Sequence, residues 1–153
     1  MTQLEPGQLW VMRIHSAVAA LLLLLAGAAA EMVLRERLAV PLGAIVLPLL
    51  VPIAWMVFLA PGRRYRAWGY SFAPDELKVK RGIWTQVRTL VPLERVQHID
   101  ISQGPLERAF RVCRLVLHTA GTLHSQVVLP GLSRETAEAM RDEIRTRISA
   151  GDP

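Results

Sequence analysis

The chain has 153 residues, the size of one ordinary domain, but 52% of them are hydrophobic and the mean hydropathy is +0.29, which excludes a uniformly water-soluble protein. The net charge of +5 comes entirely from residue 61 onward, where fifteen Lys and Arg residues outnumber ten Asp and Glu residues. The single cysteine, Cys113, excludes an intramolecular disulfide and is typical of a reducing compartment.

Two uncharged segments predict membrane-spanning helices. Residues 14–30 are seventeen residues without Asp, Glu, Lys or Arg, and residues 38–60 are twenty-three. At about 1.5 Å per residue, both can cross the hydrocarbon core of a bilayer. The residues between them, EMVLRER, are expected to form a turn that reverses the chain. We therefore expect a cytoplasmic N-terminal segment at 1–13, a transmembrane hairpin at 14–60 and a cytoplasmic folded domain at 61–153.

Two alternatives to this interpretation concern the spans themselves. Pro41, Pro48 and Pro52 predict one or two kinks in the second helix, and they would mark a broken helix around an ion or substrate only if polar residues lay beside them. No such residues stand there in the sequence. The first span also resembles a cleavable secretory signal, because LLLLLAGAAAE offers an apolar core followed by small residues.

The arginines predict the orientation of the hairpin. Arg63, Arg64 and Arg66 follow the second span directly, whereas Arg35 and Arg37 between the spans are balanced by two glutamates. Basic residues are retained on the cytoplasmic side. We therefore expect a multi-pass protein of the inner membrane with both termini in the cytoplasm.

The second part of the chain is rich in β-branched and aromatic residues broken by turn signals, which predicts strands. A turn at Pro74-Asp75 joins the first two strands, and a bend at Gly82 is expected within one long continuing strand. A bulge is expected near Gln97-His98, and a turn around Ala120-Gly121 forms a second hairpin. The expected strands are 67–73, 76–81, 83–91, 96–102, 114–120 and 123–129.

Pro130-Gly131 is expected to end the sheet, and Ser133 to cap a helix that runs to Ser149. Its apolar residues recur every three or four positions, so one face is expected to pack on the sheet. Strands followed by one amphipathic helix predict an α+β fold, a small antiparallel sheet or partly open barrel plugged by that helix. The apolar face consists of Ala137, Met140, Ile144 and Ile148.

The sequence Pro-Leu-Glu-Arg occurs at 92–95 and again at 105–108, thirteen residues later. This spacing is too short for stacked structural repeats, which need about twenty residues or more. The first copy is expected to end a strand, and the second to begin a helical turn with proline at its first position. We expect Leu93 and Leu106 to point inward and the Glu-Arg pairs to point outward.

The run VPLERVQHIDISQGPLERAFRVCRLVLHTAG, residues 91–121, closely resembles the signature of bacterial pleckstrin-homology-like domains of the YdbS type, a membrane-anchored family of bacterial PH domains. The resemblance covers about residues 65–149 and extends loosely to the spans. It implies a pleckstrin-like split barrel capped by a C-terminal helix, carried on two transmembrane helices, and no enzymatic activity. Arg111 departs from the family, whose members usually have Gly after the residue equivalent to Phe110.

The titratable residues do not predict a catalytic centre, a metal site or a cofactor. His118 and His124 flank the expected turn and oppose each other only if the loop has three residues. His98 or Asp100 would still have to complete a zinc shell. Cys113 stands at a strand start among apolar neighbours, where a small core residue is expected.

A set of basic residues predicts contact with the membrane surface, since it would be tethered near anionic headgroups. A plainer interpretation is that the arginines after the second span set the orientation of the helices in the membrane, and that the later basic residues lie on a solvated face of a strand. Nucleic acid is not expected, because the basic residues are not interleaved with stacking aromatics. The set consists of Arg63, Arg64, Arg66, Lys78, Lys80 and Arg81.

Residues 99–108 carry the most specific sequence in the chain without any evident chemistry, which is typical either of a subunit interface, the interpretation we favour, or of a turn with demanding geometry. The favoured function is a non-enzymatic scaffold that binds protein partners at the membrane surface, with binding of anionic lipid headgroups as the alternative. We expect as partner a second copy or a related PH-like membrane protein, and no small-molecule substrate. The expected interaction residues are Arg95, Gln97, Gln103 and Arg108.

Overall fold

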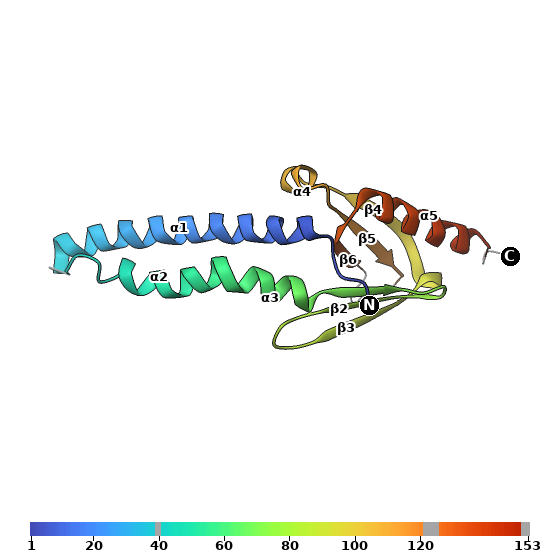
Figure 1. Cartoon of the computed structure of the whole chain (residues 1–153), viewed down its shortest axis with the longest axis horizontal. Helices are drawn as coiled ribbons and strands as arrows, with labels where there is room; N and C mark the ends of the chain where they lie inside the picture. Colours follow the sequence, from blue (N-terminus) through green and yellow to red (C-terminus); the bar gives the residue numbers. More distant parts are fainter. Residues whose placement is uncertain (39–40, 121–125, 151–153) are drawn as a thin grey trace. The chain divides into compact units, whose positions relative to one another are not determined.

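The computed structural model describes residues 1–38, 41–120 and 126–150 (Figure 1). It divides into two compact units. The hairpin unit is Met12–Arg63, and the sheet unit combines Met1–Val11 with Arg64–Pro153. The helices are α1 (Pro6–Leu38), α2 (Val46–Ala54), α3 (Ala60–Ala67), α4 (Pro105–Ala109) and α5 (Arg134–Ala150). The strands are β1 (Gly69–Phe72), β2 (Glu76–Arg81), β3 (Val87–Pro92), β4 (Val96–Ser102), β5 (Cys113–Thr119) and β6 (Gln126–Leu132).

The first apolar helix is longer than the sequence suggested. α1 runs for 33 residues to Leu38, so the expectation of a turn over EMVLRER is wrong. These residues form helix readily and include no glycine or proline, and the next helix breaker is Pro41. Pro6–Leu38 and Val46–Ala67 are both long and apolar enough to cross a membrane, by length and composition.

The three prolines of the second apolar segment have different positions. Pro41 precedes the helix, and Pro48 lies in the first turn of α2, where a missing N–H costs no intrahelical hydrogen bond. Only Pro52 is internal. A π-helical turn, η1 (Trp55–Leu59), follows it within three residues, which places the irregularity of this helix beside the one proline that interrupts its hydrogen-bond ladder.

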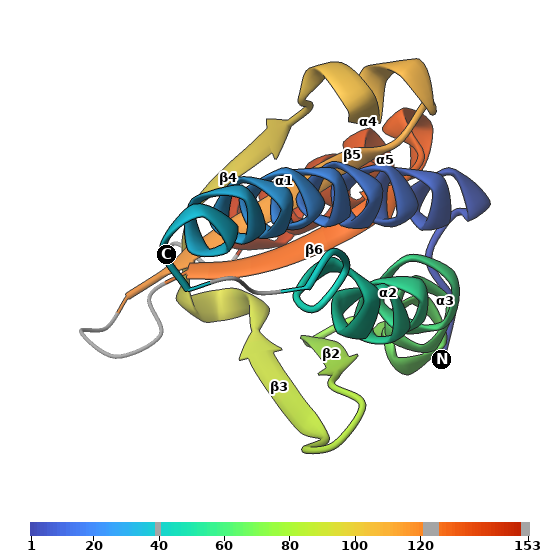
Figure 2. The same ribbon diagram turned by 90° about the vertical axis from the view of Figure 1, so that its left-hand side faces the viewer.

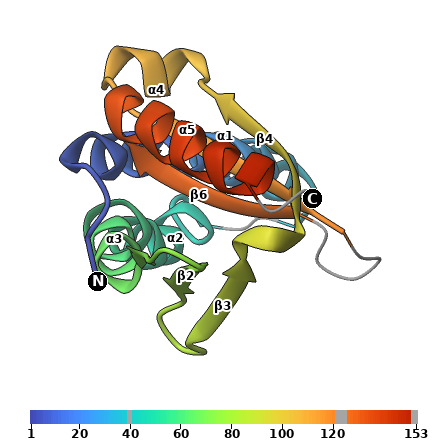
Figure 3. The ribbon, with the colours of Figure 1, turned by 90° about the vertical axis from the view of Figure 1, so that its right-hand side faces the viewer.

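The sheet unit contains two antiparallel three-stranded sheets, β1-β2-β3 and β4-β5-β6. α5 contacts β4, β5 and the short 3-10 turn η2 (Leu93–Arg95), and Figure 3 shows it lying across the second sheet. The strand-then-helix order expected from the sequence is confirmed. The fully buried side chains at the centre are Leu77, Leu115, Leu117, Leu129, Leu132 and Ile144.

The expectation of one long strand past Gly82 is wrong. The chain reverses after Arg81, which pairs with Val87, and Figure 2 shows β2 and β3 joined by this turn. Gly82 has a φ of +106°, and a Cβ there would lie 2.0 Å from the carbonyl oxygen of Thr85. Only glycine fits this position, so Gly82 starts a hairpin loop and not a bend within a strand.

The second sheet carries two irregularities. The bulge expected near Gln97-His98 is confirmed, since the register shifts between Val96 and His98. β6 continues through Pro130 and Gly131 to Leu132, so the expectation that it stops there is wrong. A second register shift lies at this point, and a bulge accommodates a proline that has no N–H to donate.

The register between β5 and β6 is not the one expected for the three-residue loop that would oppose His118 and His124. His118 pairs with Gln126. Gly121, His124 and the start of the expected strand at 123–129 lie outside the described residues.

The C-terminal helix confirms the expected cap and apolar face. The Ser133 hydroxyl oxygen accepts a hydrogen bond from the Thr136 N–H at 3.1 Å. Ala137, Met140 and Ile144 are buried in the core, and Ile148 packs at its margin. Burial of this face fixes α5 on the sheets.

Residues before the first span form part of the sheet unit and are here called the strap (Met1–Val11). Thr2 exchanges two backbone hydrogen bonds with Tyr70, at 2.7 and 3.0 Å. The Glu5 N–H donates to the Gly131 carbonyl at 2.8 Å, and the Tyr65 hydroxyl donates to the Leu4 carbonyl at 2.5 Å. The Leu4 side chain is only 3% exposed. The chain therefore leaves the sheet unit after the strap and returns to it at Arg64, while the boundaries 1–13, 14–60 and 61–153 remain predictions.

The strap should contribute measurably to the stability of the domain. We expect Leu4→Ala to lower the free energy of unfolding by about 3 kcal/mol, because it leaves a cavity in the core. Thermal and denaturant unfolding of the full chain in nanodiscs, followed by tryptophan fluorescence, measures this. Gln3→Ala, at the neighbouring exposed position, is the control and should have almost no effect. Equal stability of the two variants would show that the strap is not part of the folded unit.

Candidate functional site

β4 forms an open edge of the second sheet. The order β4-β5-β6 gives it a single neighbour, β5, and no other strand pairs with it in the described part of the chain (Figure 3). Its alternate residues Ile99 and Ile101 pack against the core. His98, Asp100 and Ser102 are exposed on the opposite face. An exposed strand edge offers unpaired backbone N–H and C=O groups to another chain.

A histidine pair adjoins this edge. His98 lies directly opposite His118 on β5, and the His118 Nε2 atom is 3.2 Å from the Asp100 Oδ2 atom. Among residues 1–38, 41–120 and 126–150, no three His, Cys, Asp or Glu side chains form a group that could hold a metal ion. The observed arrangement is therefore a polar pair across two strands.

A groove of about 310 Å³ separates β4 from the first half of α5. Its charged side chains are already paired: Arg134 with Glu138 at 2.8 Å, and Arg141 with Asp142 at 2.8 Å. The remaining lining is mixed polar and apolar, which suits a peptide or protein surface better than a small charged molecule. The lining residues are Ile99, Asp100, Ile101, Gln103, Cys113, Arg134, Glu138 and Arg141.

Cys113 lies on the floor of this groove and is 1% exposed, which confirms it as a core residue. Its Sγ atom is 3.5 Å from the Leu132 carbonyl oxygen and 3.7 Å from that of Ser133. Burial is the main cause that raises the pKa of the Cys113 thiol above its ordinary value, and nearby Glu107 adds to it. A thiol held in its protonated form is a poor nucleophile.

The second Pro-Leu-Glu-Arg copy folds differently from the expectation. Leu106 is half-buried and Glu107 is 6% exposed, so the expectation that this glutamate points outward is wrong. The Glu107 carboxylate accepts a hydrogen bond from the Gly104 N–H at 2.7 Å and pairs with Arg114 at 2.7 Å. A glutamate at the third helical position reaches back to the residue before the helix. Leu93, in the first copy, is buried as expected.

The four expected interaction residues lie around β4. Arg95 and Gln97 are exposed before and within the bulge, and Arg108 is exposed on α4. Gln103 is half-buried, and its Nε2 atom donates to the Val112 carbonyl at 2.9 Å. Gln103 therefore holds the end of β4 against the start of β5, whereas the other three are available at the surface.

The expected basic residues lie on two elements, α3 and β2. Arg63 belongs to the hairpin unit, where its guanidinium stacks 4.7 Å from the centre of the Trp55 ring. Lys78 and Lys80 share the outer face of β2, and Lys78 forms an ion pair with Glu76. Lys80 lies opposite Arg88 on β3. Arg64 and Arg66 are on α3, and Arg81 ends β2.

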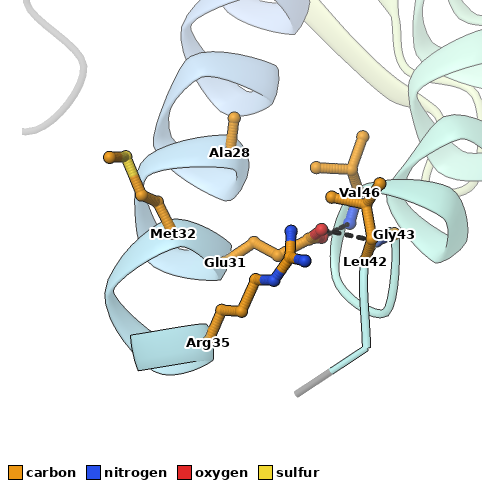
Figure 4. A pocket seen from close by; sticks show the side chains of 7 residues that line it. All are labelled: Ala28, Glu31, Met32, Arg35, Leu42, Gly43 and Val46. Atoms are coloured by element: carbon orange, nitrogen blue, oxygen red, sulfur yellow. Dashed lines mark hydrogen bonds between the residues drawn. The ribbon is translucent and has the colours of Figure 1, made fainter. Parts of the chain in front are cut away.

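Sequence reasoning missed the role of Glu31, because it assigned this residue to a turn. The Glu31 carboxylate accepts hydrogen bonds from the N–H groups of Gly43 and Val46 (Figure 4), the second at 3.1 Å, and from that of Ile45, also at 3.1 Å. These amides start the second apolar helix, so Glu31 supplies a cap to a helix that begins fifteen residues later.

A pocket of about 390 Å³ surrounds this cap (Figure 4). Its walls are apolar except for Arg35 and Glu31, whose carboxylate is already occupied by backbone amides. The arrangement ties together the two helices of the hairpin and leaves no free base for chemistry. The lining residues are Ala28, Glu31, Met32, Arg35, Leu42, Gly43 and Val46.

Two antiparallel sheets covered by a C-terminal helix and carried on two apolar helices define a membrane protein with a pleckstrin-like domain. The chain belongs to the bacterial PH domain family, whose model matches residues 16–148. This match confirms both the fold class and the resemblance described from residues 91–121.

Two curated relatives come from Bacillus subtilis (strain 168). The chain is 39% identical over 88 residues to the UPF0699 transmembrane protein YdbS, an overlap that covers 58% of this chain and 54% of that protein. It is 27% identical over 103 residues to the UPF0699 transmembrane protein YdbT, which covers 67% of this chain and 20% of that protein. The matched region thus spans about half the length of one relative and a fifth of the other. No solved structure matches the chain.

Arg111 has a φ of +55°, the left-handed region that favours glycine. We expect Arg111→Gly to raise the free energy of unfolding by about 1 kcal/mol, because it relieves backbone strain that a side chain imposes there. Denaturant unfolding of the full chain measures the change. Arg108→Gly is the matched control: it is an exposed arginine in helical conformation three residues earlier, and it should lower the stability by about 1 kcal/mol. A similar loss in both variants would contradict strain at position 111.

Proposed function

We propose that the protein acts without catalysis, as a membrane-anchored module that holds its PH domain at the cytoplasmic face of the inner membrane and associates with a second copy through the edge of β4. The observation that carries this proposal is the unpaired edge of β4, which lies beside a peptide-sized groove. Arg95, Gln97 and Arg108 surround this edge and supply polar contacts at its rim.

The strap supports a topology with both termini on one side. Residues 1–11 and the chain from Arg64 onward fold into the same unit. The 52 residues from Met12 to Arg63 must therefore leave and return, which requires an even number of membrane crossings. Arg63, Arg64 and Arg66 follow the second crossing and favour the cytoplasm for the domain.

Thiol labelling tests this topology. Cys113 is buried, so introduced cysteines should dominate the reaction with a membrane-impermeant maleimide. In intact spheroplasts, we expect the Glu36→Cys variant to react and the Gln97→Cys variant to react only after permeabilisation, because both positions are exposed in the fold. The opposite pattern, or labelling of both variants in intact cells, would reject a cytoplasmic domain.

The pattern of β4 suits pairing with its own copy about a two-fold axis. Antiparallel pairing centred on Ile99 would place His98 opposite Asp100 of the second copy, and the symmetry repeats this contact. It would also bring the two Ile99 side chains together on the inner face. The bulge precedes His98, so residues 98–102 stay regular enough to pair.

Membrane anchoring supports such an interface even if its area is small. A single strand edge buries less surface than stable soluble dimers need. Two copies confined to one bilayer, however, meet at a high effective concentration, as linked binding modules do. The membrane helices would thereby lower the affinity that the domains themselves must supply.

A charge exchange tests the interface. We expect His98→Glu alone to shift the protein toward monomers by about tenfold, because it places two carboxylates opposite each other, and Asp100→Lys added to it should restore the dimer. Native mass spectrometry of protein released from nanodiscs measures the dimer fraction.

Gln126→Glu is the matched control for this exchange, since it adds the same charge to β6, away from the β4 edge. It should leave the dimer fraction unchanged. A wild-type protein that is monomeric in membranes, or a double variant that fails to recover, would reject association through β4.

A further inference from the structure

The loop between β2 and β3, here called the tip (Gly82–Gln86), exposes apolar side chains that the sequence analysis assigned to a strand. Trp84 is 91% exposed, and Ile83 at its side is 38% exposed. Val87, the first residue of the adjoining β3, is 41% exposed. Apolar side chains gathered in this way at one end of a small domain indicate a contact surface.

The tip is framed by positive charge. Lys80 lies directly opposite Arg88, and Arg81 immediately precedes the loop. Like charges at opposed positions of two strands repel each other unless an anion lies between them. The sequence from Leu77 to Leu93 contains four basic residues and no acidic one. The tip therefore combines apolar side chains with a field that attracts anions.

The strand register places the tip at the end of the first sheet where β1 begins, directly after α3. Gly69, at the start of β1, is opposite Lys80, so the loop after Arg81 projects past the residue where the chain arrives. α3 ends at Ala67, two residues before β1 begins. Of the two ends of β2, the tip is therefore the one next to the start of β1, where the chain arrives from α3.

We propose that the tip docks on the surface of an anionic bilayer. Trp84 and Ile83 enter the interfacial layer, where an indole is favourably placed between headgroups and acyl chains. Lys80, Arg81 and Arg88 contact phosphate groups of the lipids. A bilayer is favoured over a protein partner because the protein is already anchored in one, and because the exposed charges near the loop are all of one sign.

This docking is independent of pairing through β4, since the tip belongs to the other sheet. It gives the domain a second attachment to the membrane besides the helical hairpin. A domain attached at two points is oriented with respect to the surface, whereas one attached by its linker alone can rotate.

The test uses the full chain in nanodiscs that hold one copy each. A fluorophore sensitive to its environment is attached to the Thr85→Cys variant, which keeps Trp84 intact, and the label is quenched by nitroxides on the lipid headgroups. Thr85 is exposed, whereas Cys113 is buried and should take up little label. We expect strong quenching in discs of phosphatidylcholine with phosphatidylglycerol, and a label on the Ser102→Cys variant should report the background.

Charge variants decide whether the contact is the proposed one. Lys80→Gln combined with Arg88→Gln should lower the docking equilibrium constant about 25-fold, at about fivefold for each charge removed near anionic lipid. Trp84→Ser should lower it as well. Arg145→Gln combined with Arg147→Gln removes the same charge from α5 and is the matched control.

Several outcomes would overturn the proposal. One is quenching at position 85 no greater than at position 102, and another is equal quenching in phosphatidylcholine discs with and without phosphatidylglycerol. A third is quenching that appears only in discs with two copies, which would assign the tip to a second copy of the chain. Thermal unfolding of each variant checks that the domain is intact, and these substitutions at exposed or half-buried positions should change it little.

Discussion

The backbone contacts of the strap are the constraint on which the rest of the molecule depends. Hydrogen bonds from Thr2 to Tyr70 and from Glu5 to Gly131 join the first residues of the chain to the first and last strands of the domain. Leu4 and Gln8 then fill the space beside Gly131, whose missing side chain makes room for them. The apolar hairpin is therefore an insertion within a folded unit, and both of its ends connect to that unit.

The polar groups of the chain divide into those that hold the fold and those that remain available. Glu31 and Glu107 both satisfy backbone amides at the start of a helix, and both are almost fully buried. Their carboxylates are structural. The unpaired edge of β4 and the basic, apolar tip are instead exposed, on different sheets. The proposed pairing and the proposed membrane docking would thus use separate surfaces of the domain.

Much of the fold could be predicted from sequence, because local signals and burial agree in most elements. The alternation around Leu77 and Val79, the Ser133 cap and the bulge near His98 all follow from side-chain pattern alone. The errors arise where a distant contact decides. Glu107 turns inward because its carboxylate accepts the Gly104 N–H and pairs with Arg114, seven residues later, and no local pattern indicates the second partner. The expectation of one long strand past Gly82 was wrong because a glycine with positive φ reverses the chain there. The sequence suggested individual residues for protein interaction and for membrane contact. It could not show which of them are neighbours in space, because that depends on how the strands pair.

The contact between Glu5 and Gly131 has a consequence for biosynthesis. Its two residues are separated by nearly the entire chain, so the domain has a high contact order and cannot close while the ribosome is still making β6. By then both apolar helices have left the ribosome and had time to enter the bilayer. The order of synthesis therefore allows the apolar helices to insert before the domain is complete.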